Sequence, residues 1–276
     1  MPIDSVSAKA FRGRALLGGG VAAVLIGGAV AVAVAATDDD ATASFVQPVM
    51  DEGILDFEFV GSMFDSGYSD PVVLNTEEDA LTGDVEFVPS GVLPQFIMGE
   101  PQYGDFDGDL DLDAALLIAP YAGGGTPSLY LWLWEDGEVV QVPHPAAVGE
   151  DCGDHIDQFT VVDNAIEVEM TTGWWCDGTM DPQPVEFTVA VQDGFPVQVD
   201  PGFGSPYRCP EDQFDVIAEP ETAELYVASS AGSPQIDLAA VSRIEVLERG
   251  TADGLWWLAR VTGPDDVVNC AWTPRH

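Results

Sequence analysis

Aspartates occupy every second position in one short segment, and this spacing can hold a metal ion. The alternating residues are Asp105, Asp107, Asp109, Asp111 and Asp113. Ca²⁺ prefers six to eight oxygen ligands at about 2.3–2.6 Å and mixes carboxylates with backbone carbonyls. A turning loop could supply carboxylates from its positions 1, 3, 5 and 9 and the carbonyl of Asp111 at position 7. The sequence therefore predicts a calcium-binding loop.

An apolar run, Ala114–Ala119, follows the last aspartate directly and is typical of a buried strand. Asp and Glu make up 48 of the 276 residues, so acidic clusters also arise by chance. A solvated acidic loop is therefore the alternative interpretation. The ordered spacing that leads straight into a strand favours the metal loop, whereas the acidic runs at 38–40, 77–79 and 265–266 are interpreted as solvated surface.

This part of the chain resembles the calcium loops of FG-GAP/VCBS-type repeats, which read roughly D-x-[DN]-x-D-G-x-x-D before an apolar strand. The resemblance covers about residues 85–142 and includes Tyr103-Gly104-Asp105 and the run Leu129–Trp134. It implies an exported bacterial domain in which the ion stabilises structure and performs no chemistry. Those loops usually have glycine at position 6; here Leu110 occupies it and Gly108 lies at position 4. One good loop is found, so the resemblance does not imply a propeller.

Aromatic side chains form a second candidate site, a platform for sugar rings. Its residues are Tyr130, Trp132, Trp134 and Trp174. Trp132 and Trp134 would share one face of a strand, whereas Trp174 and its neighbour Trp175 would point to opposite faces. Packing in the core is the alternative. The platform supports a second functional hypothesis, a carbohydrate-binding protein or a glycosidase.

Motifs typical of catalysis are missing from the sequence. It contains neither a Gly-x-Ser-x-Gly elbow nor a His-Glu-x-x-His zinc motif. An Asp154–His155 dyad with a distant serine, or a pair of glycosidase carboxylates, stays open as an alternative. We expect a non-catalytic protein and leave the enzyme question open.

The charge balance argues against nucleic acid as a partner. The formal net charge is −40, and after residue 36 the chain keeps five arginines and no lysine. No basic patch can form from so few bases, so binding to phosphate backbones is disfavoured. Self-repulsion of this size is screened at high salt. The composition resembles that of halophilic proteins; an ordinary acidic secreted protein from a high-GC genome is the alternative.

The N-terminus has the pattern of an export signal. Lys9, Arg12 and Arg14 precede an uncharged run over 15–36, which as a helix would be about 33 Å long and could cross a bilayer. Residues 1–14 would then stay in the cytoplasm. The run ends in small residues at 33–36, so cleavage of a signal peptide near Ala36 is the alternative to a transmembrane anchor. Either outcome places the rest of the chain outside the cytoplasm.

The four cysteines agree with export. They are Cys152, Cys176, Cys209 and Cys270. An even number in an oxidising compartment favours disulfides, and three pairings are possible. We prefer Cys152–Cys176 with Cys209–Cys270, because each pair stays within one predicted segment. A zinc site is the rival interpretation, but no Cys-x-x-Cys spacing supports it.

Short apolar or alternating runs separated by Gly, Pro and Asp predict an all-β fold. The predicted strands are Ile54–Val60, Val85–Val88, Ala114–Ile118, Leu129–Trp134, Val139–Val142, Phe159–Val162, Ile166–Met170, Val185–Val191, Leu225–Ala228, Ile244–Leu247, Leu255–Val261 and Val267–Ala271. Asp136-Gly137 is a strong hairpin signal, Asp163-Asn164 a similar one, and Asp237–Val241 allows a short helix.

The organisation predicted from these elements has three parts after the N-terminal run. Residues 37–52 form an acidic tether, and 53–200 form an antiparallel meander or sandwich-like domain that contains the calcium loop. A turn-rich stretch at 200–206 separates this domain from a small β module, 201–276, clipped by a disulfide. The leading functional hypothesis is a non-catalytic envelope-associated module, stabilised by Ca²⁺, that has a binding or structural role toward an envelope glycan or protein.

Overall fold

The computed structural model describes most of the chain from Met50 onward. The described ranges are 50–66, 71–76, 78–79, 94–120, 126–149, 153–172, 182–209, 216–218, 223–251 and 253–275. All of them belong to the compact unit Phe45–His276. Within these ranges no helix has the length and apolar character needed to cross a bilayer, and the predicted span 15–36 lies outside them.

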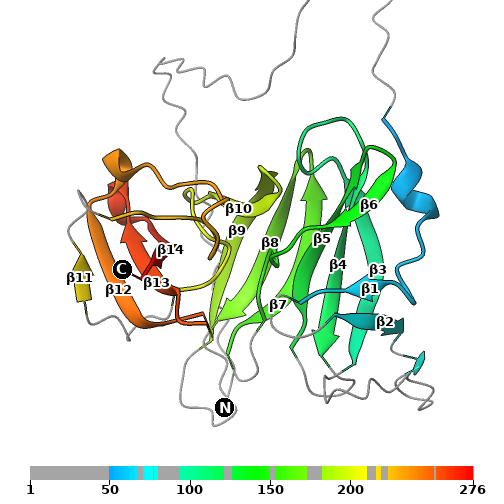
Figure 1. Ribbon diagram of the computed structural model, residues 1–276, viewed down its shortest axis with the longest axis horizontal. Helices are drawn as coiled ribbons and strands as arrows, with labels where there is room; N and C mark the ends of the chain where they lie inside the picture. Colours follow the sequence, from blue (N-terminus) through cyan, green and yellow to red (C-terminus); the bar gives the residue numbers. More distant parts are fainter. Residues whose placement is uncertain are drawn as a thin grey trace, which may run out of the picture. The chain divides into compact units, whose positions relative to one another are not determined.

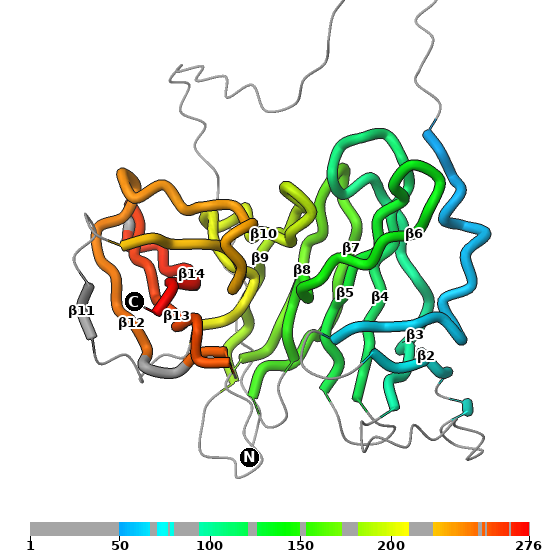
Figure 2. Tube along the Cα trace, in the orientation of Figure 1, coloured from blue at the N-terminus to red at the C-terminus, as the bar shows by residue number. Residues whose placement is uncertain are grey.

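The described part of the chain is an all-β structure with three sheets, as the sequence predicts (Figure 1). Each sheet is built from one continuous stretch of sequence, so the colour of the trace changes steadily from the first sheet to the third (Figure 2). Local connections of this kind follow from the short turns between antiparallel strands.

The first sheet has the strand order β1-β2-β3-β4-β5-β6 and is antiparallel except between β2 and β3, which run parallel. Its strands are β1 (Met63–Phe64), β2 (Val72–Thr76), β3 (Gln95–Gly104), β4 (Asp113–Pro120), β5 (Ser128–Glu135) and β6 (Glu138–Gln141). One face packs against the middle sheet, and the N-terminal segment with Ile54 and Phe59 covers the other. Because both faces are covered, β4 and β5 are apolar almost throughout instead of alternating.

The middle sheet has the order β10-β9-β8-β7 and is antiparallel. Its strands are β7 (His155–Val162), β8 (Ala165–Thr172), β9 (Gln183–Gln192) and β10 (Phe195–Asp200). Strand β8 alternates, with Ile166, Val168 and Met170 buried and Glu167 and Glu169 exposed. The buried face joins the apolar side chains of β5 in one core cluster, which makes the two sheets a sandwich.

The third sheet has the order β11-β12-β13-β14 and is also antiparallel. Its strands are β11 (Val216–Ala218), β12 (Arg243–Gly250), β13 (Trp256–Thr262) and β14 (Val268–Pro274). Ile244, Ala259 and Ala271 from its apolar face share a core cluster with Val197 of β10. This contact joins the third sheet to the middle one.

Aspartate-led turns connect the hairpins. Asp136 and Gly137 have φ values of 51° and 86°, as a two-residue type I′ turn requires. Asp193 and Gly194 repeat this pattern between β9 and β10, with φ values of 53° and 74°. Asp163 begins the turn between β7 and β8 with a φ of 52°. The two turns predicted from the sequence are thus confirmed, and the turn at Asp193-Gly194 is a third of the same kind.

The predicted strand Ile54–Val60 is wrong. A 3-10 helix, η1 (Gly53–Asp56), occupies its start, and an extended segment without a ladder follows. A Cβ atom on Gly53 would lie only 2.2 Å from the Trp134 ring, so the chain is pressed closely onto the first sheet there. Ile54 is fully buried in this contact. The segment is apolar because it covers the sheet, and it is not a member of it.

Other predicted elements differ in smaller ways. Leu225–Ala228 is not a strand; Tyr226 makes isolated bridges instead. The short helix predicted within Asp237–Val241 is present as the 3-10 turn η3 (Leu238–Ala240), with Asp237 as its N-cap. A further 3-10 turn, η4 (Pro264–Asp266), precedes β14. The predicted strand Val85–Val88 lies outside the described residues.

Candidate metal centre

The acidic loop connects β3 to β4, the two strands at the centre of the first sheet. Gly104, the last residue of β3, pairs with Asp113, the first residue of β4. Within the loop Phe106 turns inward, is 1% exposed and joins the core between the two sandwich sheets. Its carbonyl accepts a hydrogen bond of 3.1 Å from the amide of Val191. One buried ring thus anchors a loop in which every second residue is an aspartate.

The aspartates shape the loop through hydrogen bonds to its own backbone. The Asp105 carboxylate accepts from the amides of Gly108 at 2.7 Å and Leu110 at 3.2 Å. The Asp107 carboxylate accepts from the Asp109 amide at 3.2 Å, and the Asp109 carboxylate accepts from the Asp111 amide at 2.8 Å. Asx turns of this kind let successive short acids curl the chain. Gly108 and Leu110 have left-handed φ values of 85° and 77°.

This curl brings three of the predicted ligands together. Asp105, Asp107 and Asp109 each place one carboxylate oxygen so that the three atoms lie within 4.8 Å of one another. Asp105 is 5% exposed, and the other two are on the surface. The group therefore has a buried base and an open rim.

Asp113 is not part of this group, because its carboxylate is used inside the fold. The side chain is 1% exposed and accepts hydrogen bonds from the amides of Phe106 at 2.7 Å and Trp134 at 3.1 Å. Loss of hydration raises the pKa of Asp113 to about 7, although both hydrogen bonds act to lower it. The structure therefore gives this residue a role in holding the loop to β5.

Asp111 also lies outside the group of three, and its backbone meets a residue from the predicted tether. Asp111 forms an isolated parallel bridge with Asp51. The Asp51 amide donates to the Leu110 carbonyl at 3.2 Å, and its carbonyl accepts from Leu112 at 2.8 Å. Desolvation, followed by the charges of Asp109 and Asp51, raises the pKa of Asp111. No local signal at Asp51, inside the predicted tether, could have indicated this pairing.

The loop concentrates negative charge that no described cation balances by an ion pair. Loss of hydration and the charge of Asp109 raise the pKa of Asp107 to about 6, and Glu135 adds to the effect. A bound cation would remove this repulsion. Three carboxylates are a hard, all-oxygen donor set, which suits Ca²⁺ and does not suit metals that favour nitrogen or sulfur. The residues present therefore fit Ca²⁺, with further oxygen ligands left to backbone or water.

The predicted aromatic platform is mostly inside the protein. Tyr130 and Trp132 are 5% and 2% exposed and belong to the cluster under the N-terminal segment. Their rings meet those of Phe64 and Phe59 edge-on, at centroid distances of 4.8 Å and 5.4 Å. Trp134 is partly buried, and Trp174 lies outside the described residues. The rings of Tyr130 and Trp132 are thus used for packing and are not offered to a ligand.

Of the other residues selected from the sequence, some lie in described contacts and some lie outside the described residues. Cys209 and Cys270 form a disulfide, as preferred from the sequence. Cys152 and Cys176 lie outside the described residues. Asp154 lies 3.9 Å from the guanidinium of Arg208, while the neighbouring His155 is exposed.

Comparison with protein-family models, with curated proteins and with solved structures gives no match for this chain. Its function must therefore be inferred from its own residues and their geometry.

Proposed function

We propose that this chain is a non-catalytic module of the cell envelope, exported from the cytoplasm and stabilised by Ca²⁺, with a binding or structural role. The observation that supports the proposal best is the convergence of Asp105, Asp107 and Asp109. A metal held there would fix the loop between the central strands β3 and β4, which is already anchored in the core by the ring of Phe106. Such an ion stabilises the fold and needs no substrate.

The disulfide and the N-terminal pattern support the extracytoplasmic part of the proposal. Cys209 and Cys270 are oxidised, and disulfides persist mainly in oxidising compartments. The basic residues before the apolar run 15–36 are typical of a segment that directs export, either as an anchor or as a cleaved signal. Protease added to intact cells should then digest the chain beyond residue 36.

Thermal unfolding in Ca²⁺ and in chelator tests the metal proposal. Ca²⁺ at one hundred times its Kd should stabilise the protein by about 2.7 kcal/mol. For a unit of this size that corresponds to a Tm increase of roughly 5–10 °C. The double variant Asp107→Ala, Asp109→Ala should lose the difference between the two conditions.

A matched control separates a specific ion from general screening of acidic charge. The double variant Glu167→Gln, Glu169→Gln removes two exposed carboxylates from the outer face of the middle sheet. It should keep the full Ca²⁺ effect, and Mg²⁺ or Na⁺ at equal ionic strength should not replace Ca²⁺. A parent protein with the same Tm in Ca²⁺ and chelator would refute the proposal.

A further inference from the structure

The segment 201–209 leaves β10 and lies along β14 of the third sheet. The Ser205 amide donates to the Cys270 carbonyl at 2.8 Å, and four residues later Cys209 is bonded to the Cys270 sulfur. The two cysteines are separated by 61 residues in sequence, with Cα atoms 5.4 Å apart. One short stretch is therefore attached to β14 by both a ladder-type hydrogen bond and a covalent bond.

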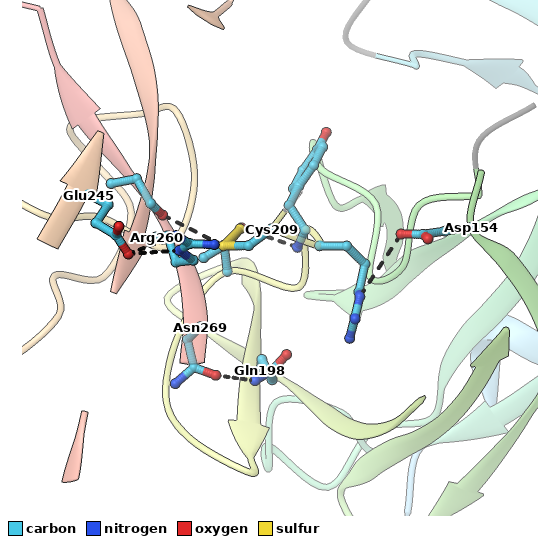
Figure 3. Close-up of a disulfide and its surroundings, with 11 residues drawn as sticks. Asp154, Gln198, Cys209, Glu245, Arg260 and Asn269 are labelled. Atoms are coloured by element: carbon cyan, nitrogen blue, oxygen red, sulfur yellow. Dashed lines mark hydrogen bonds and ion pairs between the residues drawn. A yellow bond between two sulfur atoms is a disulfide. The ribbon is translucent and has the colours of Figure 1, made fainter. Parts of the chain in front are cut away.

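The segment contacts side chains on both faces of β14, and β10 contacts one of these faces. Asn269 and Ala271 share the face that meets β10, where Ala271 packs in the core and the Asn269 carboxamide accepts from Gln198 at 2.6 Å. Cys270 and Trp272 lie on the opposite face, because side chains alternate along a strand. Figure 3 shows the two attachments, with the Gln198–Asn269 hydrogen bond and the disulfide at Cys209.

Alternation within the segment itself directs neighbouring side chains to different sheets. The Tyr207 ring meets that of Trp272 edge-on at 5.5 Å, on the same face as the disulfide. Arg208, between Tyr207 and Cys209, instead reaches toward the middle sheet, where its Nε lies 3.9 Å from the Asp154 carboxylate. The segment thus bridges the two sheets.

Close backbone contact explains the glycines in this segment. A Cβ atom on Gly202 would lie 2.5 Å from the Asn269 carboxamide, and one on Gly204 would lie 2.8 Å from the Asn269 Cβ. Gly204 and Gln198 also exchange backbone hydrogen bonds of 2.9 Å and 3.0 Å. Larger residues would push the segment away from β14.

The charge distribution adds a reason for the bridge. Residues 15–207 contain no lysine or arginine, so Arg208 is the first such base after Arg14. Its partner Asp154 belongs to the part of the chain that has carboxylates without basic residues. The pair is partly exposed and 3.9 Å long, so it orients the segment more than it stabilises it. The disulfide is the strong member of the attachment.

We propose that the Cys209–Cys270 disulfide is a redox-sensitive clamp that makes the third sheet unfold together with the middle sheet. A dithiol reductant supplies two electrons and two protons to the sulfur–sulfur bond, which becomes two thiols while the dithiol forms its own disulfide. The segment 201–209 then loses its covalent attachment to β14. The apolar contact through Val197 remains, so the third sheet stays folded at equilibrium. Without the disulfide it can unfold transiently while the middle sheet stays folded. This proposal does not depend on the metal loop.

Amide hydrogen exchange followed by mass spectrometry tests the clamp. The experiment uses full-length Cys152→Ser, Cys176→Ser protein, in which only the Cys209–Cys270 pair can be reduced. In the oxidised form, peptides from β12–β14 and from β8–β9 should show equal protection, because both exchange through the same unfolding event. After reduction, β12–β14 should exchange clearly faster than β8–β9, because the third sheet can then unfold while the middle sheet stays folded. The acceleration in β12–β14 can reach about a thousand-fold, since reduction frees a loop of this length in every unfolded state that contains it.

Each other outcome would overturn the proposal. Equal acceleration in both sheets would mean that the bond stabilises the whole unit without controlling coupling. Unchanged exchange in β12–β14 would mean that the clamp has no effect. Should the double serine variant fail to fold, untreated Cys209→Ser, Cys270→Ser protein gives the same comparison with the parent, because the other two cysteines are then left as they are. Arg208→Gln in oxidised protein is the matched control, and it should change β12–β14 exchange by less than about fivefold.

Discussion

Phe106 offers the most direct test of how the acidic loop is held. It is 1% exposed, lies in the core between the two sandwich sheets, and is flanked in sequence by Asp105 and Asp107, two of the proposed metal ligands. Replacing a buried phenylalanine by alanine costs about 3–5 kcal/mol, which combines lost apolar burial with the cavity left behind. Because the backbone amide and carbonyl of Phe106 are unchanged, its hydrogen bonds to Asp113 and Val191 can persist. We therefore expect Phe106→Ala to lose about 4 kcal/mol, mostly through packing.

Urea unfolding in chelator measures this loss without any contribution from metal. With an m-value of about 3 kcal/mol/M, the midpoint should fall by roughly 1.3 M while m stays the same. Phe106→Leu should lose less, since it keeps most of the apolar volume. A loss below about 1 kcal/mol for Phe106→Ala would refute the reasoning, because the ring would then add nothing to the core. A second measurement, the proposed Ca²⁺-dependent change in Tm, should also decrease in Phe106→Ala, because the two neighbouring aspartates of the candidate site lose their anchor.

Two further predictions concern single residues. Leu110 is 45% exposed and has a φ of 77°, a conformation that costs a residue with a Cβ about 1–2 kcal/mol. In urea unfolding, Leu110→Gly should therefore leave the stability unchanged or raise it by up to about 1 kcal/mol. A clear loss of stability would show that the leucine side chain is required. Desolvation lowers the pKa of His144, which stacks on Phe195 at 5.7 Å. The unfolded chain then binds more protons than the folded one, so this residue's stabilising contribution is complete above about pH 6.5 and is lost as pH falls toward its lower folded pKa. His144→Gln should flatten the stability curve in that window, by at most about 1.4 kcal/mol per pH unit, and identical curves for the two proteins would contradict the assignment.

Local sequence features determined much of the fold. The strict alternation of Ile166, Val168 and Met170 with glutamates set the register of β8, because only one face of that strand is buried. The Asp-Gly turn at Asp136 set the hairpin, because its φ values suit that pair of residues. These signals act over two to eight residues, so they can be recognised without knowing the fold.

The candidate metal site could be predicted only in part from local sequence patterns. The spacing of Asp105, Asp107 and Asp109 indicated convergence, because Asx turns are formed within the loop itself. The Asp113 carboxylate points into the fold because it accepts a hydrogen bond from the amide of Trp134, which is distant in sequence. The pairing of Asp51 with the loop likewise joins residues that no local pattern relates.

The sequence by itself determined most of the strands, the hairpin turns and the curl of the acidic loop, because these depend on backbone preference and short-range hydrogen bonds. Tertiary structure alone decided which faces are covered. Tyr130 and Trp132 are buried because the segment with Ile54 and Phe59 lies over their face of the sheet. No pattern in the sequence indicates that this segment covers that face. Covering a face depends on contacts between segments far apart in the chain, and such contacts are specified by shape and volume rather than by any periodicity that one segment contains.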